Sequence, residues 1–344
     1  TLAQAFQEAG FLTAAFTAGE AATRQSIPGF GFFQNEVGPD ADYAAVRHAI
    51  EWLRAQGTAV GKNLFVWLHL AGPAAPYDPV PVGKTGFGDR FVDPDYAGSA
   101  NGSLDYLAAA RSPAADVSGQ DLGQVTALYD AEIARVNHLV LGFVGAYAGT
   151  YGTLPVDHLT DTVLVFAADR GEELFQRNRA FEHPASVYDS ALHVPLVFHH
   201  PGSLTGSRVV QEPVELADVM PTLLDWFQID APEGIEGRSL LPLVDSYVER
   251  PFDSRPVFGL WGDRIATART SRFRLVWNPE GVDPGAGSGR SYPVPVLALF
   301  DHQRDPRELV DVAAEHPEVV AALREAIQGW LADGGDPLLL ERFQ

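Results

Sequence analysis

Apolar runs of strand length alternate with amphipathic stretches of helix length, and this alternation constrains the fold more than any other feature of the sequence. Residues 63–70 (NLFVWLHL) and 161–168 (DTVLVFAA) are nearly continuous apolar runs, as expected for strands buried on both faces of a sheet. A third run covers residues 192–198 (LHVPLVF). Strands that alternate with helices favour a parallel sheet covered by helices on both faces.

Helical spacing of apolar residues recurs between these runs. The first such stretch ends at Gly10 and is followed by a short strand-like run over residues 11–16. The three stretches with this spacing are residues 2–9, 41–57 and 122–148. The order helix, turn, strand therefore repeats along the first part of the chain.

Two changes in amino-acid composition and pattern predict how the chain is divided into parts. Residues 72–123 are rich in Gly, Pro, Asp and Ser, which predicts a long loop excursion. From about residue 250, short strand-like segments precede one final helix at 317–331. We therefore predict an α/β fold with a doubly wound, mostly parallel sheet over residues 1–249, and a small C-terminal antiparallel α+β subdomain over residues 250–344.

Charge and cysteine content exclude several classes of function. The chain has 45 acidic and 24 basic residues and a formal net charge of -21, so its field repels nucleic acid and anionic membranes. No apolar run approaches the roughly 20 residues of a membrane-spanning helix. The absence of cysteine excludes disulfides and thiolate metal sites. An enzyme for anionic esters would need local positive charge, from a metal ion or from arginine.

Several segments, in order and correctly spaced, resemble the sulfatase family of the alkaline phosphatase superfamily. The resemblance extends over almost all of the 344 residues, including a tail similar to the sulfatase C-terminal subdomain. The segments that carry it are TLAQAFQEAGFLTAAF (1–16), NLFVWLHLAGPAAPYDP (63–79), LYDAEIARVNHLV (128–140), DTVLVFAADRGEEL (161–174), FEHPASVYDSALHVPLVFHHPG (181–202) and the stretch from 214 to 244. Such an ordered set is more specific than one short motif.

The resemblance implies that an N-terminal part of the domain is missing. In the family, the nucleophile and a first pair of metal-binding aspartates lie before the segment that matches residues 1–16. The chain opens at Thr1 without an initiator methionine or a signal peptide. Ser26 and the other serines do not stand in the nucleophile's context, so we expect them to be ordinary loop residues.

The strand that carries metal ligands in the family ends here in Asp169-Arg170-Gly171 instead of Asp-His-Gly or Asp-Asn-Gly. Asp169 matches a metal ligand, whereas an arginine has no lone pair to donate and would repel a cation. Two interpretations of Arg170 are open. Its guanidinium occupies the metal position and neutralises Asp169, or it points to solvent.

Other positions depart from the family pattern or only partly retain it. Ala74 and Arg177 stand where the family has histidine, and neither side chain can act as a general acid. His183 matches a histidine of the family's GHG-like loop, either as an anion-binding remnant or as a structural residue. Arg170 and Arg177 are further candidates for anion binding. We expect His69 to be a packed, hydrogen-bonded strand residue.

Three departures within one catalytic unit predict a pseudoenzyme, a sulfatase-type scaffold that serves as a binding, structural or assembly module. This interpretation predicts no cofactor and, as partners, other protein subunits. The alternative is an active sulfuric-ester or phosphoester hydrolase that uses Ca or Mg, with its nucleophile and aspartate pair on an upstream segment. A third interpretation pairs the chain with a separate N-terminal fragment that supplies the central strand. The family's habit suggests a periplasmic or extracellular location.

Overall fold

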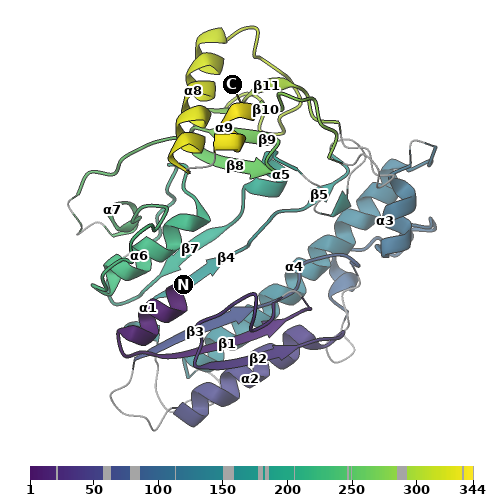
Figure 1. Cartoon of the computed structure of the whole chain (residues 1–344). Coiled ribbons are helices and arrows are strands. Elements are labelled where there is room, and N and C mark those ends of the chain that lie inside the picture. Colours follow the sequence, from purple (N-terminus) through teal and green to yellow (C-terminus); the bar gives the residue numbers. More distant parts are fainter. Residues whose placement is uncertain are drawn as a thin grey trace.

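The computed structural model describes residues 1–20, 22–56, 63–77, 86–112, 114–149, 159–176, 181–182, 186–204, 206–245, 248, 250–284, 293–334 and 337–343. Arg177 and His183 lie outside these residues. Figure 1 shows a body of sheet and helices that carries a second sheet near the C-terminus. In the part described, no helix is both long and apolar enough to span a membrane.

Three parallel strands form the first sheet. Strand β1 (Leu12–Ala18) lies between β2 (Phe32–Glu36) and β3 (Leu64–His69). The centre of β1 is fully buried, and its alanines allow helices to pack closely on both faces. This arrangement confirms the parallel sheet predicted from the sequence.

The next two strands form a separate pair. Strand β4 (Leu164–Ala167) pairs with β7 (Leu196–His199) in the antiparallel direction, so the strand predicted at 192–198 is present but does not run parallel to its neighbour. A parallel return usually requires a long crossover helix. The described part of this connection instead holds only β5 (Glu173–Leu174), β6 (Phe181–Glu182) and the four-residue α5 (Asp189–Leu192).

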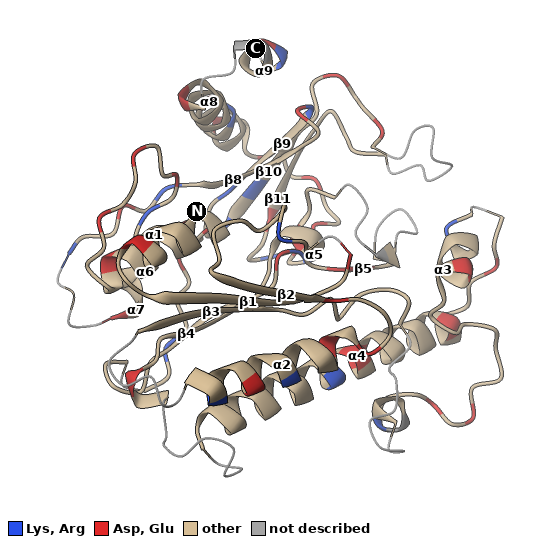
Figure 2. Cartoon of the chain, turned by 60° about the horizontal axis from the view of Figure 1, so that its bottom comes forward, with Lys and Arg blue, Asp and Glu red and all other residues tan. Residues whose placement is uncertain are grey.

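Helices cover both faces of the parallel sheet, as Figure 2 shows edge-on. Helices α1 (Leu2–Glu8) and α6 (Val219–Trp226) lie on one face, and α2 (Ala41–Gln56) and the long α4 (Gly119–Tyr147) lie on the other. Helix α4 begins with a capping box in which Ser118 and Asp121 satisfy each other's backbone N–H groups. The doubly wound α/β class is therefore confirmed.

Few regular elements occur in the described residues between 72 and 118. They are a 3₁₀ turn at Phe87–Arg90 and helix α3 (Leu104–Ala110). Tyr77 and Leu107 pack there in a hydrophobic cluster with Val125 of α4. The excursion is thereby attached to the long helix.

The second sheet is antiparallel, with strand order β11-β10-β9-β8. Its strands are β8 (Val257–Trp261), β9 (Ile265–Arg269), β10 (Phe273–Trp277) and β11 (Leu297–Asp301). Helices α8 (Pro317–Asp333) and α9 (Pro337–Arg342) cover one face, where Leu275, Leu299 and Ile327 are completely buried. The small helix α7 (Leu241–Val244) lies between the two parts in sequence.

Candidate anion-binding site at the ends of strands β3 and β4

The loop after β3 is held by a buried carboxylate on a neighbouring helix. Asp42 of α2 accepts hydrogen bonds from the backbone N–H groups of Ala71 (2.7 Å) and Gly72 (3.3 Å). It also accepts one from Nη2 of Arg135 on α4, at 2.8 Å. One side chain thus ties the loop to both helices.

Arg135 is balanced by two carboxylates. Its Nε donates to Glu132 at 2.9 Å, and all three side chains of this network are almost completely buried. Burial lowers the pKa of Arg135, but Glu132 and Asp42 more than offset this effect, so the pKa is raised. The guanidinium therefore stays charged and rigid, and serves structure rather than proton transfer.

A buried tyrosine joins the loop after β3 to the loop after β4. The hydroxyl of Tyr77 donates to a carboxylate oxygen of Glu172. The ring of Tyr129 packs edge-on against Tyr77, with 5.4 Å between centroids. Burial, followed by the charge of Glu172, raises the pKa of Tyr129 to about 12. The two loops therefore meet at the same end of the molecule.

Ala74 lies half-buried in the loop between Gly72 and Tyr77. Its methyl group leaves this position without a proton donor or an anion ligand. His69, at the end of β3, is also half-buried, and its side chain has no hydrogen-bond partner among the residues described. The hydrogen bond expected for the side chain of His69 stays a prediction.

Asp169 and Arg170 follow β4 and are both exposed. Within the described ranges neither forms a hydrogen bond or an ion pair, so Arg170 does not neutralise Asp169 there. The adjoining backbone is fixed, because the N–H of Gly171 donates to Ala191 at 2.8 Å. A Cβ on Gly171 would lie 2.0 Å from the oxygen of Ser190, which explains the glycine. Whether Arg170 occupies a metal position stays a prediction.

Among the described residues, the donors near Asp169 do not by themselves form a divalent-cation site. Such an ion requires several oxygen or nitrogen ligands around one point. The next carboxylate, Glu172, binds Tyr77, and Glu173 accepts from Ser186 (2.9 Å) and Ser190 (2.6 Å). Asp169 belongs to no group of three potential ligands in the part of the chain that the structure describes.

A different acidic cluster was not found by sequence reasoning. Potential ligand atoms of Asp189, His302 and Glu308 lie within 4.8 Å of one another. Two arginines already neutralise it. Arg274 donates to Asp189 (2.7 Å) and forms an ion pair with Glu308 (2.7 Å), and Arg269 also pairs with Asp189. The cluster is an ion-pair network that attaches α5 to the C-terminal sheet, and no local motif could have revealed it.

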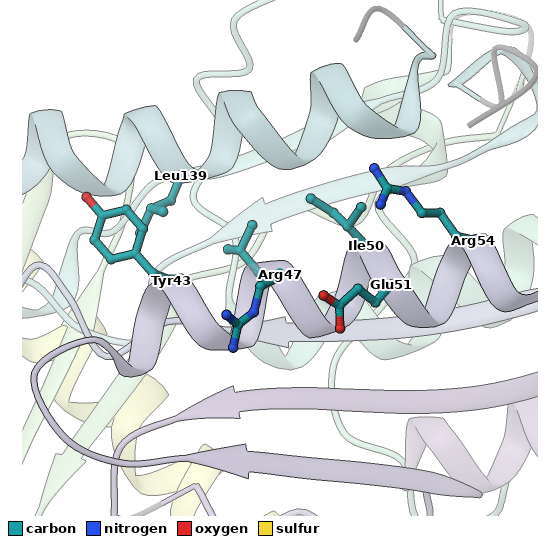
Figure 3. A pocket seen from close by; sticks show the side chains of 7 residues that line it. Tyr43, Arg47, Ile50, Glu51, Arg54 and Leu139 are labelled. Atoms are coloured by element: carbon teal, nitrogen blue, oxygen red, sulfur yellow. The ribbon is translucent and has the colours of Figure 1, made fainter. Parts of the chain in front are cut away.

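A shallow cavity of about 260 Å³ lies between α2 and α4 (Figure 3). Tyr43, Ile50 and Leu139 form its apolar part, and Arg47, Glu51 and Arg54 lie along its rim. It contains no arrangement of groups suited to catalysis.

The parallel sheet between two helical layers, with loops converging at the strand ends, defines an alkaline phosphatase-like fold. The Sulfatase family model matches residues 1–229, and the chain belongs to the sulfatase family. It is 26% identical over 315 residues to Arylsulfatase K of Gallus gallus, covering 83% of this chain and 55% of that protein. An Arylsulfatase of Clostridium perfringens is 24% identical over 297 residues, covering 82% and 56%. The chain thus spans about half the length of these curated relatives.

The fold also resembles solved structures. The phosphonate monoester hydrolase of Agrobacterium radiobacter superposes with a TM-score of 0.70 at 20% identity, covering 97% of this chain and 80% of that one. At this identity the likeness shows the fold alone.

Proposed function

We propose that this chain is a catalytically inactive sulfatase-type module that serves in binding, structure or assembly. The observation that carries the proposal is the state of Asp169. It is the metal-strand aspartate by resemblance, yet the residue after it, where the family has a histidine or asparagine ligand, is an arginine that cannot bind a cation.

Further support comes from the neighbouring loop. Ala74 provides a methyl group where the family places a histidine, while the surrounding backbone is firmly held by Asp42. The scaffold has thus kept its packing and lost polar groups. Catalytic residues that act as a unit do not compensate for one another, so two such losses leave little hydrolytic activity.

Metal analysis tests this proposal. We expect a longer natural form of the protein, the form also needed for the turnover test, to contain no stoichiometric calcium or magnesium, and Arg170→Asn or Arg170→His in that form to gain one of them if the guanidinium excludes the ion. Arg208→Asn is the matched control, because Arg208 is also exposed and lies outside the site. A stoichiometric divalent ion in the unmodified protein would contradict the proposal.

One observation favours a second candidate, an active sulfuric-ester or phosphoester hydrolase. Arg170 is exposed and forms no ion pair within the described residues, so its charge is available to an anionic ester. In this case the nucleophile and the Ca or Mg ligands lie on an upstream segment. The test is turnover of an aryl sulfate and of a phosphodiester by a longer natural form of the protein. Turnover abolished by Arg170→Ala supports it, and no turnover rejects it.

Partner subunits and a periplasmic or extracellular location stay predictions from the family resemblance. Fractionation of source cells, followed by detection of the protein, checks the location.

A further inference from the structure

The cavity between α2 and α4 combines an apolar floor with a basic rim. Val46, Ile50 and Leu139 provide aliphatic side chains, and the ring of Tyr43 adds an aromatic surface. Ligand pockets are typically apolar, with a few polar groups that orient the ligand. The volume of about 260 Å³ lies just below the range of pockets for drug-sized molecules, so the cavity suits a small molecule.

The cavity is elongated. Its lining residues on α2 recur at Tyr43, residues 46–47, residues 50–51 and Arg54, which is the spacing of one face of a helix. At the rise of an α-helix this stripe extends about 16 Å along α2. Figure 3 shows Tyr43 and Arg54 at opposite ends of the cavity, both directed towards α4. An extended chain fits this shape better than a compact ring system.

The rim has the opposite charge balance from the whole chain. Among the described residues that line the cavity, two arginines (Arg47 and Arg54) stand against a single acidic residue, Glu51, whereas the chain has 45 acidic and 24 basic residues. All three side chains are exposed, so the charges lie at the mouth and the floor stays apolar. An anionic group at the mouth can pair with the guanidinium groups and keep part of its hydration.

The two ends of the cavity differ in charge. The Tyr43 end adjoins a buried network of two carboxylates and one guanidinium (Asp42, Glu132 and Arg135), which carries a net negative charge. The opposite end has the guanidinium of Arg54. An anion is therefore repelled from the first end and attracted to the second, and this difference orients a ligand that has one charged end.

We propose that this cavity binds a small anionic amphiphile, an unbranched aliphatic carboxylate whose chain lies along α2 and whose carboxylate pairs with Arg54 and Arg47. The aliphatic chain covers Val46 and Ile50, and its end points towards Tyr43. The proposal rests on the shape and charge of the cavity, and it is independent of whether the protein hydrolyses esters.

Titration with straight-chain carboxylates tests the proposal. The probe is octanoate below its micelle concentration, and isothermal titration calorimetry on the full chain measures its affinity. We expect one bound molecule per chain and an affinity that rises about threefold or more at each step from hexanoate to octanoate to decanoate, since each added methylene removes apolar surface from water. Octylamine, which has the same chain and a cationic head group, should bind about tenfold more weakly or less.

Charge-reversed variants locate the carboxylate. Arg54→Glu and Arg47→Glu should each weaken octanoate binding about threefold or more, a modest effect because exposed ion pairs are partly screened by water. Arg208→Glu is the matched control, since it makes the same charge change at an exposed position outside the cavity and should leave the affinity unchanged. Equal weakening by all three variants would show that octanoate responds only to net charge, and would overturn the proposal.

A second set of variants locates the aliphatic chain. Ile50→Asp should abolish binding, because it places a carboxylate on the cavity floor. Ile133→Asp makes the same change elsewhere on the protein, at a 44% exposed position of α4 that does not line the cavity, and should leave the affinity unchanged. Urea unfolding checks that each variant folds, and the milder Ile50→Thr, expected to weaken binding about threefold or more, replaces Ile50→Asp if that variant does not fold.

The strands offer a competing apolar surface. Trp67 of β3 is 41% exposed and Phe166 of β4 is 38% exposed, so our expectation that both strands are buried on two faces was wrong. Phe166→Asp should leave octanoate binding unchanged. Loss of binding in Phe166→Asp but not in the Ile50 variants, binding to phosphatidylglycerol vesicles but not to dissolved octanoate, or no binding of any of the three carboxylates would overturn the proposal.

Discussion

At the scale of single residues, the position that governs the candidate site is Gly72. A Cβ at this position would lie 2.3 Å from Nη2 of Arg135 and 3.2 Å from an oxygen of Asp42. We predict that Gly72→Ala lowers the free energy of unfolding by about 1–3 kcal/mol, because it forces apart groups in a tightly packed interior. Urea unfolding followed by tryptophan fluorescence measures the change.

Gly142→Ala is the matched control. Gly142 lies on α4, the helix that carries Arg135, and a Cβ there meets no atom within 4 Å. We expect a gain of up to about 1 kcal/mol, because alanine favours the helix over glycine. Equal effects of the two substitutions would show that the network does not fix the loop.

At the scale of elements, α5 is joined to β9 and β10 by Asp189. Burial raises the pKa of Asp189, but a hydrogen bond with His193 and the charges of Arg274 and Arg269 more than offset this, so the pKa lies well below its usual value. Asp189→Asn leaves Arg274, only 4% exposed at its side chain, without one partner. We predict a loss of about 3–5 kcal/mol in the free energy of unfolding at pH 7.

The sign of the pH dependence follows from the lowered pKa. A carboxylate with a lowered pKa stabilises the fold above the pKa that it has when unfolded, about 3.9, and this stability is lost as pH falls further. The difference between wild type and Asp189→Asn should therefore begin to shrink below about pH 5 and continue to shrink as the pH falls towards the lowered pKa. Asp333→Asn, at an exposed position near the end of α8, should change little at any pH. A difference that does not vary with pH would exclude the ion-pair explanation.

The periodicity of apolar residues predicted the positions of the helices better than it predicted which strands pair with one another and how exposed each strand is. The helices near 2–9, 41–57 and 122–148 are present because each shows a continuous apolar face. The direction of β7 and the exposure of β4 depend on which strand lies alongside, and local sequence does not encode this. The same limit applies to the site. Asp42 and Arg135 lie 93 residues apart in sequence, so no motif could show that they hold the loop around Ala74.

At the scale of the whole molecule, the excess of acidic residues over basic ones produces electrostatic repulsion in the folded protein. A net charge of -21 creates repulsion among surface carboxylates, and acidic residues (red) occur along α2 and α4 in Figure 2. Salt shortens the reach of this repulsion from about 30 Å at 0.01 M to about 8 Å at 0.15 M. The buried pairs of Arg135 and Arg274 are screened much less, because water and ions do not surround them.

We therefore predict that NaCl stabilises the protein at neutral pH. Raising NaCl from about 10 mM to about 150 mM should increase the midpoint of thermal unfolding by a few degrees at pH 7.5, since screening relieves surface repulsion more than it weakens buried pairs. The same salt change near pH 4.7, the isoelectric point, is the control, because net repulsion vanishes there. If the unfolding midpoint rises equally at both pH values, salt acts through hydration rather than charge. If the midpoint falls at pH 7.5, attractive pairs of surface charges outweigh the repulsion among acidic residues.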